Sequence, residues 1–215
     1  YSQWESLPDY VGDAKIFPLV DVSGSMGVFE STSSLEPIHV AISLGLYLAD
    51  KNSSDFKDIF LTFTSYPDIV ELKGDLKDKI NQMNNAEWGM STDISRAFSK
   101  ILQVACDNKV SPSDMPEVLL ILSDMQFDIA CDYNDTALQV AKKEYAAAGY
   151  DLPRIVFWNL SDNTTNIAVG HVDSNTAAIS GFNTAILKSV LADNLEEFTP
   201  ESVMMEAIML DRYKL

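Results

Sequence analysis

Three short runs of apolar residues do most to limit how this chain can fold. Residues 16–20, 118–122 and 155–158 are almost wholly apolar, have no polar face and are too short for helices. Such runs are typical of strands that are buried on both faces of a parallel sheet. A sheet of this kind needs helices on both faces, because each face must be covered.

Segments with a helical period separate these runs. Apolar residues recur at helical spacing over 35–50, 76–83, 92–107 and 136–148, and further helices are expected up to Ala192 and over 199–215. Additional strands are expected at 59–63, 69–72 and 177–180. The strand at 69–72 follows a short turn, which predicts an antiparallel edge hairpin. The order predicts a three-layer α/β fold with a mostly parallel sheet of about six strands, one of them an antiparallel edge strand.

Length and composition favour one domain over residues 1–215, with an N-terminal extension at 1–14 and a C-terminal helix at 199–215. The chain begins with Tyr1, so we expect a fragment of a longer protein. Cys106 and Cys131 lack metal-site spacing and are expected to be reduced, partly buried thiols.

The net charge of −17 argues against direct binding to nucleic acid or to anionic membranes. The sequence contains neither a signal peptide nor an apolar stretch of the roughly 20 residues that span a bilayer. We therefore expect no membrane association and an intracellular, cytoplasmic location.

Oxygen-bearing side chains stand where two of the buried strands end. Asp21, Ser23 and Ser25 follow the first strand, and Asp124 follows the strand at 118–122. Thr92 opens a helix that could start at the same edge of the sheet. Ligands of α/β sheets bind outside the carboxyl ends of the strands, and hard oxygen donors suit Mg²⁺, or else Mn²⁺ or Ca²⁺. These five residues are the predicted metal ligands.

Each of these residues also has a purely structural interpretation. Ser and Asp favour strand-end turns, and Thr92 suits a helix N-cap. Met26 suits either contact with a partner or packing beneath the loop, and His39 and His171 have no ligand partner in the sequence and are treated as incidental. The metal interpretation is favoured because three separate segments contribute to it.

The segments DVSGSM, GMSTDI and LLILSDM resemble the three loops of a von Willebrand factor type A (vWA) domain. In that Rossmann-like family these loops form the metal-ion-dependent adhesion site. The resemblance assigns the metal to Asp21, Ser23, Ser25, Thr92 and Asp124, and implies that a protein partner or a neighbouring domain supplies an Asp or Glu to it. Asp93 and Asp128 lie beside these residues and are expected to tune them without touching the metal.

A narrower resemblance runs through WGMSTD, SDMQFD, IVFWNL, SGF and the terminal TPESVMMEAI. These segments are similar to an uncharacterised family of plant, viral and bacterial proteins whose C-terminal half is a vWA domain. That family is distantly akin to the Ro-type RNA-chaperone (TROVE) proteins. The resemblance implies a helical module upstream of this chain.

Three functions follow, from different classes. The favoured one is metal-dependent recognition of a carboxylate. The second is a component of a Ro-like ribonucleoprotein whose RNA is held by another module. The third is a metal-dependent phosphatase or nuclease. It is disfavoured because an aspartyl-phosphate enzyme normally needs a second acidic residue, as general acid and base, at the position of Ser23. We therefore expect no catalysis and no catalytic residue.

Overall fold

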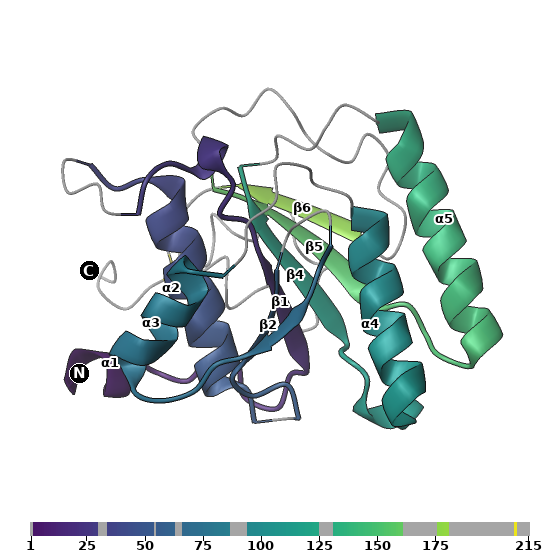
Figure 1. The fold of residues 1–215 in the computed structure, drawn as a ribbon, viewed down its shortest axis with the longest axis horizontal. Helices are drawn as coiled ribbons and strands as arrows, with labels where there is room; N and C mark the ends of the chain where they lie inside the picture. The colour runs from purple at the N-terminus through teal and green to yellow at the C-terminus, as the bar shows by residue number, and fades with distance from the viewer. Residues whose placement is uncertain are drawn as a thin grey trace.

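A computed structural model of the chain describes residues 2–29, 34–53, 55–62, 66–86, 94–124, 131–160, 176–180 and 209. A six-stranded sheet in the order β3-β2-β1-β4-β5-β6 forms its centre (Figure 1). Its strands are β1 (Ile16–Val20), β2 (Ile59–Thr62), β3 (Ile69–Glu71), β4 (Val118–Ser123), β5 (Arg154–Asn159) and β6 (Thr176–Ser180). Neighbouring strands are parallel except for β2 and β3, which are antiparallel. The predicted fold class is confirmed.

Helices cover both faces of this sheet (Figure 1). One face packs against α2 (Pro37–Lys51) and α3 (Leu76–Asn84), and the other against α4 (Ile94–Asn108) and α5 (Cys131–Ala148). Successive residues of a strand point to opposite faces, so Leu119 joins the core under α4 while Leu120 joins the core under α2. This two-sided burial explains why the strands are apolar throughout.

Two details differ from the sequence predictions. Helix α5 begins at Cys131 rather than Thr136, because its backbone continues helically through the turn-favouring Asn134. Cys106 is free as predicted but exposed rather than partly buried. It lies on the outer face of α4, whose inner face is formed by residues such as Ile101 and Ala105. The predicted helices up to Ala192 and over 199–215 lie outside the described residues, apart from Met209.

The predicted N-terminal extension is ordered against α2. It begins with the short helix α1 (Ser2–Glu5), whose Trp4 ring packs edge-on against Tyr47. The Tyr47 hydroxyl donates a hydrogen bond to the carbonyl of Pro8 at 2.7 Å and accepts one from the amide of Tyr10 at 2.9 Å. These contacts fasten the segment to the helix that leads away from β1.

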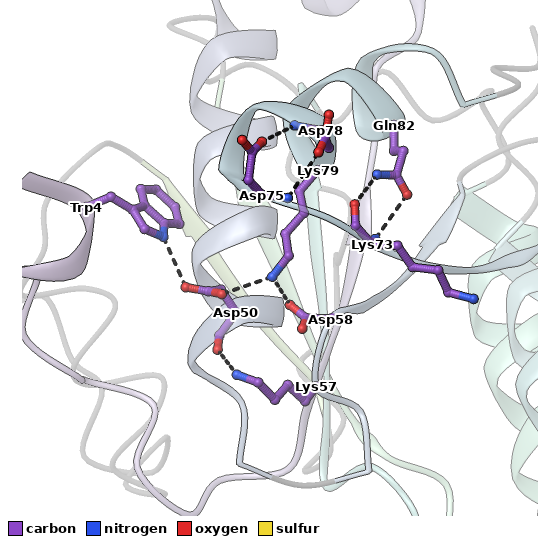
Figure 2. A network of polar contacts seen from close by, with 9 residues as sticks. All are labelled: Trp4, Asp50, Lys57, Asp58, Lys73, Asp75, Asp78, Lys79 and Gln82. Carbon is purple, nitrogen blue, oxygen red and sulfur yellow. Dashed lines mark hydrogen bonds and ion pairs between the residues drawn. The ribbon is translucent and has the colours of Figure 1, made fainter. Parts of the chain in front are cut away.

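Charged side chains gather at the amino edge, which we define as the edge of the sheet where the parallel strands begin. Lys79 Nζ lies 3.2 Å from Asp50 Oδ1 and 2.6 Å from Asp58 Oδ1, and the indole of Trp4 donates to Asp50 Oδ2 at 3.0 Å (Figure 2). The Lys57 ammonium donates to the Asp50 carbonyl. We call Trp4, Asp50, Asp58 and Lys79 the amino-edge cluster; it ties α1, α2 and α3 to the start of β2.

No helix in the described part of the chain is long and apolar enough to cross a membrane.

Candidate metal centre

The predicted ligands of the first and fourth strands lie at the point where the chain changes direction across the sheet. From β1 the chain moves outward to β2 and β3, and it then returns to place β4 on the other side of β1. The segment after β1 leads to α2 on one face, whereas the segment after β4 leads to α5 on the other. Such a switch point is where ligands of α/β sheets bind. We call this side of the sheet, where the parallel strands end, the carboxyl edge.

Asp21 is buried at the end of β1, with 3% of its surface exposed. Its Oδ1 accepts a hydrogen bond from the Ser23 amide at 2.8 Å, and its Oδ2 accepts one from the Ser123 hydroxyl at 2.6 Å. The Asp21 amide donates to the Leu122 carbonyl, which extends the pairing of β1 with β4 by one residue. Backbone and side chain of Asp21 are therefore both fixed by protein contacts.

Two hydroxyls stand next to this carboxylate in the chain. The Oγ atoms of Ser23 and Ser25 are 3.0 Å apart, with Ser23 half-buried and Ser25 exposed. A 3₁₀ turn, η1 (Gly24–Met26), brings them together, and Met26 anchors it as a fully buried core residue. Packing beneath the loop is thus the role of Met26. Ser23 makes no side-chain hydrogen bond to cap the turn, so capping does not account for its hydroxyl.

A second buried carboxylate, Asp124, follows β4 and is 5% exposed. Burial raises the pKa of Asp21 above its ordinary value. The hydrogen bonds from Ser123 and Ser23 oppose this rise, and the nearby negative charge of Asp124 adds to it. A divalent cation between the two strand ends would oppose this rise, because it would favour the charged form of Asp21.

The start of α2 is fastened to the segment that leaves the predicted metal loop. Glu36 Oε2 accepts a hydrogen bond from the Val28 amide at 2.6 Å. His39 Nδ1 accepts one from the Glu36 amide at 3.0 Å, and its Nε2 lies 2.9 Å from the Phe29 carbonyl. Gly27 permits this approach, because its φ is +103° and the Glu36 side chain occupies the place where a Cβ would be.

His39, treated above as incidental, therefore has a structural role. One signal in the sequence could have indicated this role: His39 is the third residue after Glu36, the spacing of a capping box at the start of a helix. Ser123 was not among the predicted site residues, because the predicted strand covered 118–122 and Ser123 came directly after it; its hydroxyl nevertheless reaches Asp21. Its link to β1 depends on strand register, which the sequence alone does not specify.

Of the five predicted ligands, the structure describes Asp21, Ser23, Ser25 and Asp124. Thr92 lies outside the described residues, as do Asp93 and Asp128. Within the described ranges no three residues of the types His, Cys, Asp and Glu come together as a metal-binding group. Two buried carboxylates and two hydroxyls are nevertheless hard oxygen donors, and this donor set fits Mg²⁺, Mn²⁺ or Ca²⁺ better than zinc.

Comparison with one solved structure agrees with the fold. The Ro (RSR) protein of Deinococcus radiodurans superposes with a TM-score of 0.58 at 15% identity, over 88% of this chain and 35% of that one. At this identity the match shows a shared fold and nothing more. The manganese-loaded TRAP protein of Plasmodium vivax, at 15% identity, gives a TM-score of 0.46 over 82% of this chain and 72% of that one, which is too low to support an argument.

Sequence comparisons identify the family. Uncharacterized protein L728 of Acanthamoeba polyphaga mimivirus is 33% identical over 215 residues, which cover 96% of this chain and 36% of that protein. The chain thus spans just over a third of the length of this relative. The family model described as "Domain of unknown function (DUF7788)" matches residues 16–211. This chain belongs to the DUF7788 family.

Proposed function

We propose that this chain is a metal-dependent recognition module. Asp21, Ser23, Ser25, Thr92 and Asp124 hold a hard divalent cation, Mg²⁺ or else Mn²⁺ or Ca²⁺, at the carboxyl edge. The observation that supports this most directly is the pair of buried carboxylates at the switch point, beside two hydroxyls that lie 3.0 Å apart. When bound, the cation would supply an open coordination position for a carboxylate of a protein partner or of a neighbouring domain.

The proposed ligands have different roles in such a site. Asp21 is held by neutral donors, so its negative charge is available to a cation. The hydroxyls of Ser23 and Ser25 add oxygen atoms without adding charge, which keeps the cation attractive to an outside carboxylate. Asp93 and Asp128 remain proposed as residues that tune these ligands.

Recognition fits these residues better than hydrolysis does. A phosphatase that used Asp21 as nucleophile would need a nearby group to give and take protons. Ser23 occupies the second position after Asp21, and its ordinary hydroxyl is a poor general acid near neutral pH. The hydrolase remains the minority alternative, and it predicts turnover of a generic phosphate ester in Mg²⁺ or Mn²⁺.

The Ro-like fold supports a second candidate, in which this domain is one part of a larger ribonucleoprotein. The chain corresponds to 35% of the Deinococcus Ro chain. Its net charge of −17 would repel a phosphate backbone, so RNA would be held by another module. Under this candidate the carboxylate that reaches the site comes from a neighbouring domain of the same protein.

Calorimetric titration of the intact protein with Mg²⁺ and with Mn²⁺ tests the proposal. Asp21→Asn should abolish binding, whereas Asp107→Asn should leave it intact. Asp107 is the matched control, because it is exposed in the last turn of α4 and its substitution changes the charge equally. Equal binding by all three proteins, or none by the unaltered protein, would contradict a metal centre at Asp21.

Capture experiments then test recognition. A partner identified by pull-down should require both Mg²⁺ and Asp21, and it should be released by a chelator. Substitution of the partner's own Asp or Glu by its amide should abolish capture as completely as Asp21→Asn does. A partner that persists in chelator would show that the site is not the recognition device.

A further inference from the structure

Ser123 connects the two strand ends that carry the buried carboxylates. It is the last residue of β4, it is fully buried, and its hydroxyl donates to Asp21 Oδ2 at 2.6 Å. The two residues are 102 positions apart in the sequence. Serine hydroxyls more often bond to nearby backbone, so this contact across the sheet is an unusual use of a strand serine. Its length is typical of a hydroxyl that donates to an ionised carboxylate.

The backbone on both sides of Ser123 is fixed. The Asp21 amide donates to the Leu122 carbonyl at 2.9 Å, and the Leu160 amide donates to the Ser123 carbonyl at 2.9 Å. Ser123 is also in register with Asn159 of β5. Because its neighbours on both strands fix the backbone and the side chain is buried, the hydroxyl approaches Asp21 from a constant direction.

Both oxygens of Asp21 receive donors. Oδ1 accepts from the Ser23 amide and Oδ2 from the Ser123 hydroxyl, and the Ser23 hydroxyl also bonds to this carboxylate. Donors on both oxygens fix the plane of the carboxylate. A carboxylate has about four acceptor positions on its two oxygens, so these three donors leave room for a cation.

We infer that Ser123 is a positioning residue for the metal centre: its hydroxyl orients the Asp21 carboxylate toward the cation without ligating the cation itself. This inference rests on the proposed function, since it concerns the same site. Residues that orient metal ligands in this way typically change metal affinity by 10- to 100-fold when they are removed.

A purely structural role for Ser123 makes a different prediction. If the hydroxyl merely satisfied a buried carboxylate, its loss would lower the melting temperature by the same amount in chelator and in metal. If it orients a ligand, its loss must also weaken metal binding and shrink the rise in melting temperature that the metal causes. The two roles therefore separate when affinity and stability are measured together.

The experiment compares the intact protein with Ser123→Ala, Ser123→Thr and Asp21→Asn. Mn²⁺ affinity is measured by calorimetry at pH 7.0 and at pH 8.5, and melting temperature is measured in chelator and in saturating Mn²⁺. We expect Ser123→Ala to bind Mn²⁺ at least tenfold more weakly at both pH values. Ser123→Thr, which keeps a hydroxyl, should bind within about threefold of the unaltered protein. Ser123→Val is compared with Ser123→Thr if Ser123→Ala fails to fold, because this pair has the same shape and differs in the hydroxyl.

Each alternative outcome has a definite meaning. If the unaltered protein binds Mn²⁺ and Ser123→Ala binds it equally well, the positioning role is wrong and the metal centre stands. Ser123→Ala could also lose Mn²⁺ affinity at pH 7.0 and regain it at pH 8.5. The hydroxyl would then act on the protonation of Asp21 rather than on its orientation, and this result also overturns the inference. If the unaltered protein binds no Mn²⁺, the proposed function and the inference fail together.

Discussion

The two edges of the sheet hold carboxylates in opposite ways, partly buried ones at the amino edge and buried ones at the carboxyl edge. At the amino edge, the Lys79 ammonium lies within 3.2 Å of Asp50 and Asp58, so a positive charge offsets two negative ones. At the carboxyl edge, Asp21 receives its hydrogen bonds from neutral groups, the amide and hydroxyl of Ser23 and the hydroxyl of Ser123. The neighbouring Asp124 adds a second negative charge.

The pKa values of the two regions express this difference. Burial by itself raises the pKa of Asp50, but the hydrogen bonds from Trp4 and Lys79 and the charge of Lys79 leave it below its usual value. Burial raises the pKa of Asp21, and neutral donors do not fully reverse that rise. The amino-edge cluster supplies its own counter-charge, whereas the donors to Asp21 are uncharged; under the proposed function a cation from outside would supply the counter-charge there.

Among the variants that test this contrast between the two edges, Asp21→Asn should have the largest effect. Loss of the carboxylate charge is expected to weaken Mg²⁺ binding by at least about 100-fold, because both charge and ligand strength are lost. In chelator the free energy of unfolding should not fall, since a buried charge with neutral partners is removed. Calorimetry and urea unfolding measure the two quantities. A large loss of stability in chelator would show that the charge of Asp21 is compensated in the fold.

Asp50→Asn is the counterpart of that variant at the amino edge. It should leave Mg²⁺ affinity unchanged and lower the free energy of unfolding, because it weakens contacts to Lys79 and Trp4. The same two measurements apply. Equal losses of Mg²⁺ affinity in Asp50→Asn and Asp21→Asn would remove the distinction between the two edges.

Lys79→Met should lower the free energy of unfolding by about 2 kcal/mol, because it leaves two partly buried carboxylates facing each other. The Lys79 side chain is 13% exposed, so solvent screens these charges incompletely. Urea unfolding at neutral pH measures the loss, and Mg²⁺ affinity should stay constant. Lys77→Met, at an exposed position of the same helix, is the matched control and should have little effect.

The stability that Lys79 supplies should depend on pH only at the extremes. The pKa of Asp50 is lowered in the fold, so its contribution is present above the ordinary carboxyl pKa of about 3.9 and is lost as pH falls through the folded value. The pKa of Lys79 is raised, so its contribution is present below about 10.4 and is lost as pH rises through the folded value. Between about pH 5 and pH 9, urea unfolding should therefore show a constant difference in the free energy of unfolding between the unaltered protein and Lys79→Met. A change within that range would contradict this assignment.

Trp4→Phe should have the smallest effect, about 1 kcal/mol, because it removes the hydrogen bond to Asp50 and keeps an aromatic ring against Tyr47. Thermal unfolding measures the loss of stability, and Trp4→Ala shows how much stability the aromatic ring contributes. A loss larger than that of Lys79→Met would mean that the N-terminal segment, rather than the ion pairs, holds the amino edge together.

The parts of the molecule that could be predicted from the sequence depend on local patterns. Strands such as β4 could be predicted because burial on both faces makes them apolar throughout. The places of Asp21 and Asp124 at the ends of two such strands followed from this, whereas their role as metal ligands stays a prediction. Thr92 stays a prediction, since the structure does not describe it.

The parts that escaped prediction depend on contacts between distant residues or on competition between local signals. The hydrogen bond from Ser123 to Asp21 requires the register of β1 against β4, which neither strand encodes alone. The early start of α5 could not be predicted because Asn134 favours turns and the helix overrides that preference.

The pairing of β1 with β4 has a consequence for how the protein is made. Ile16 is in register with Val118, so the centre of the sheet closes only after more than 100 intervening residues have left the ribosome. Such distant pairing is slow to form, and until it forms β1 exposes an apolar edge to which other chains can bind. Asp21 also lacks its contact with Ser123 and the nearby charge of Asp124 until β4 has been made. Nascent chains that end before Ser123 should therefore depend on chaperones, and they would lack the proposed metal centre.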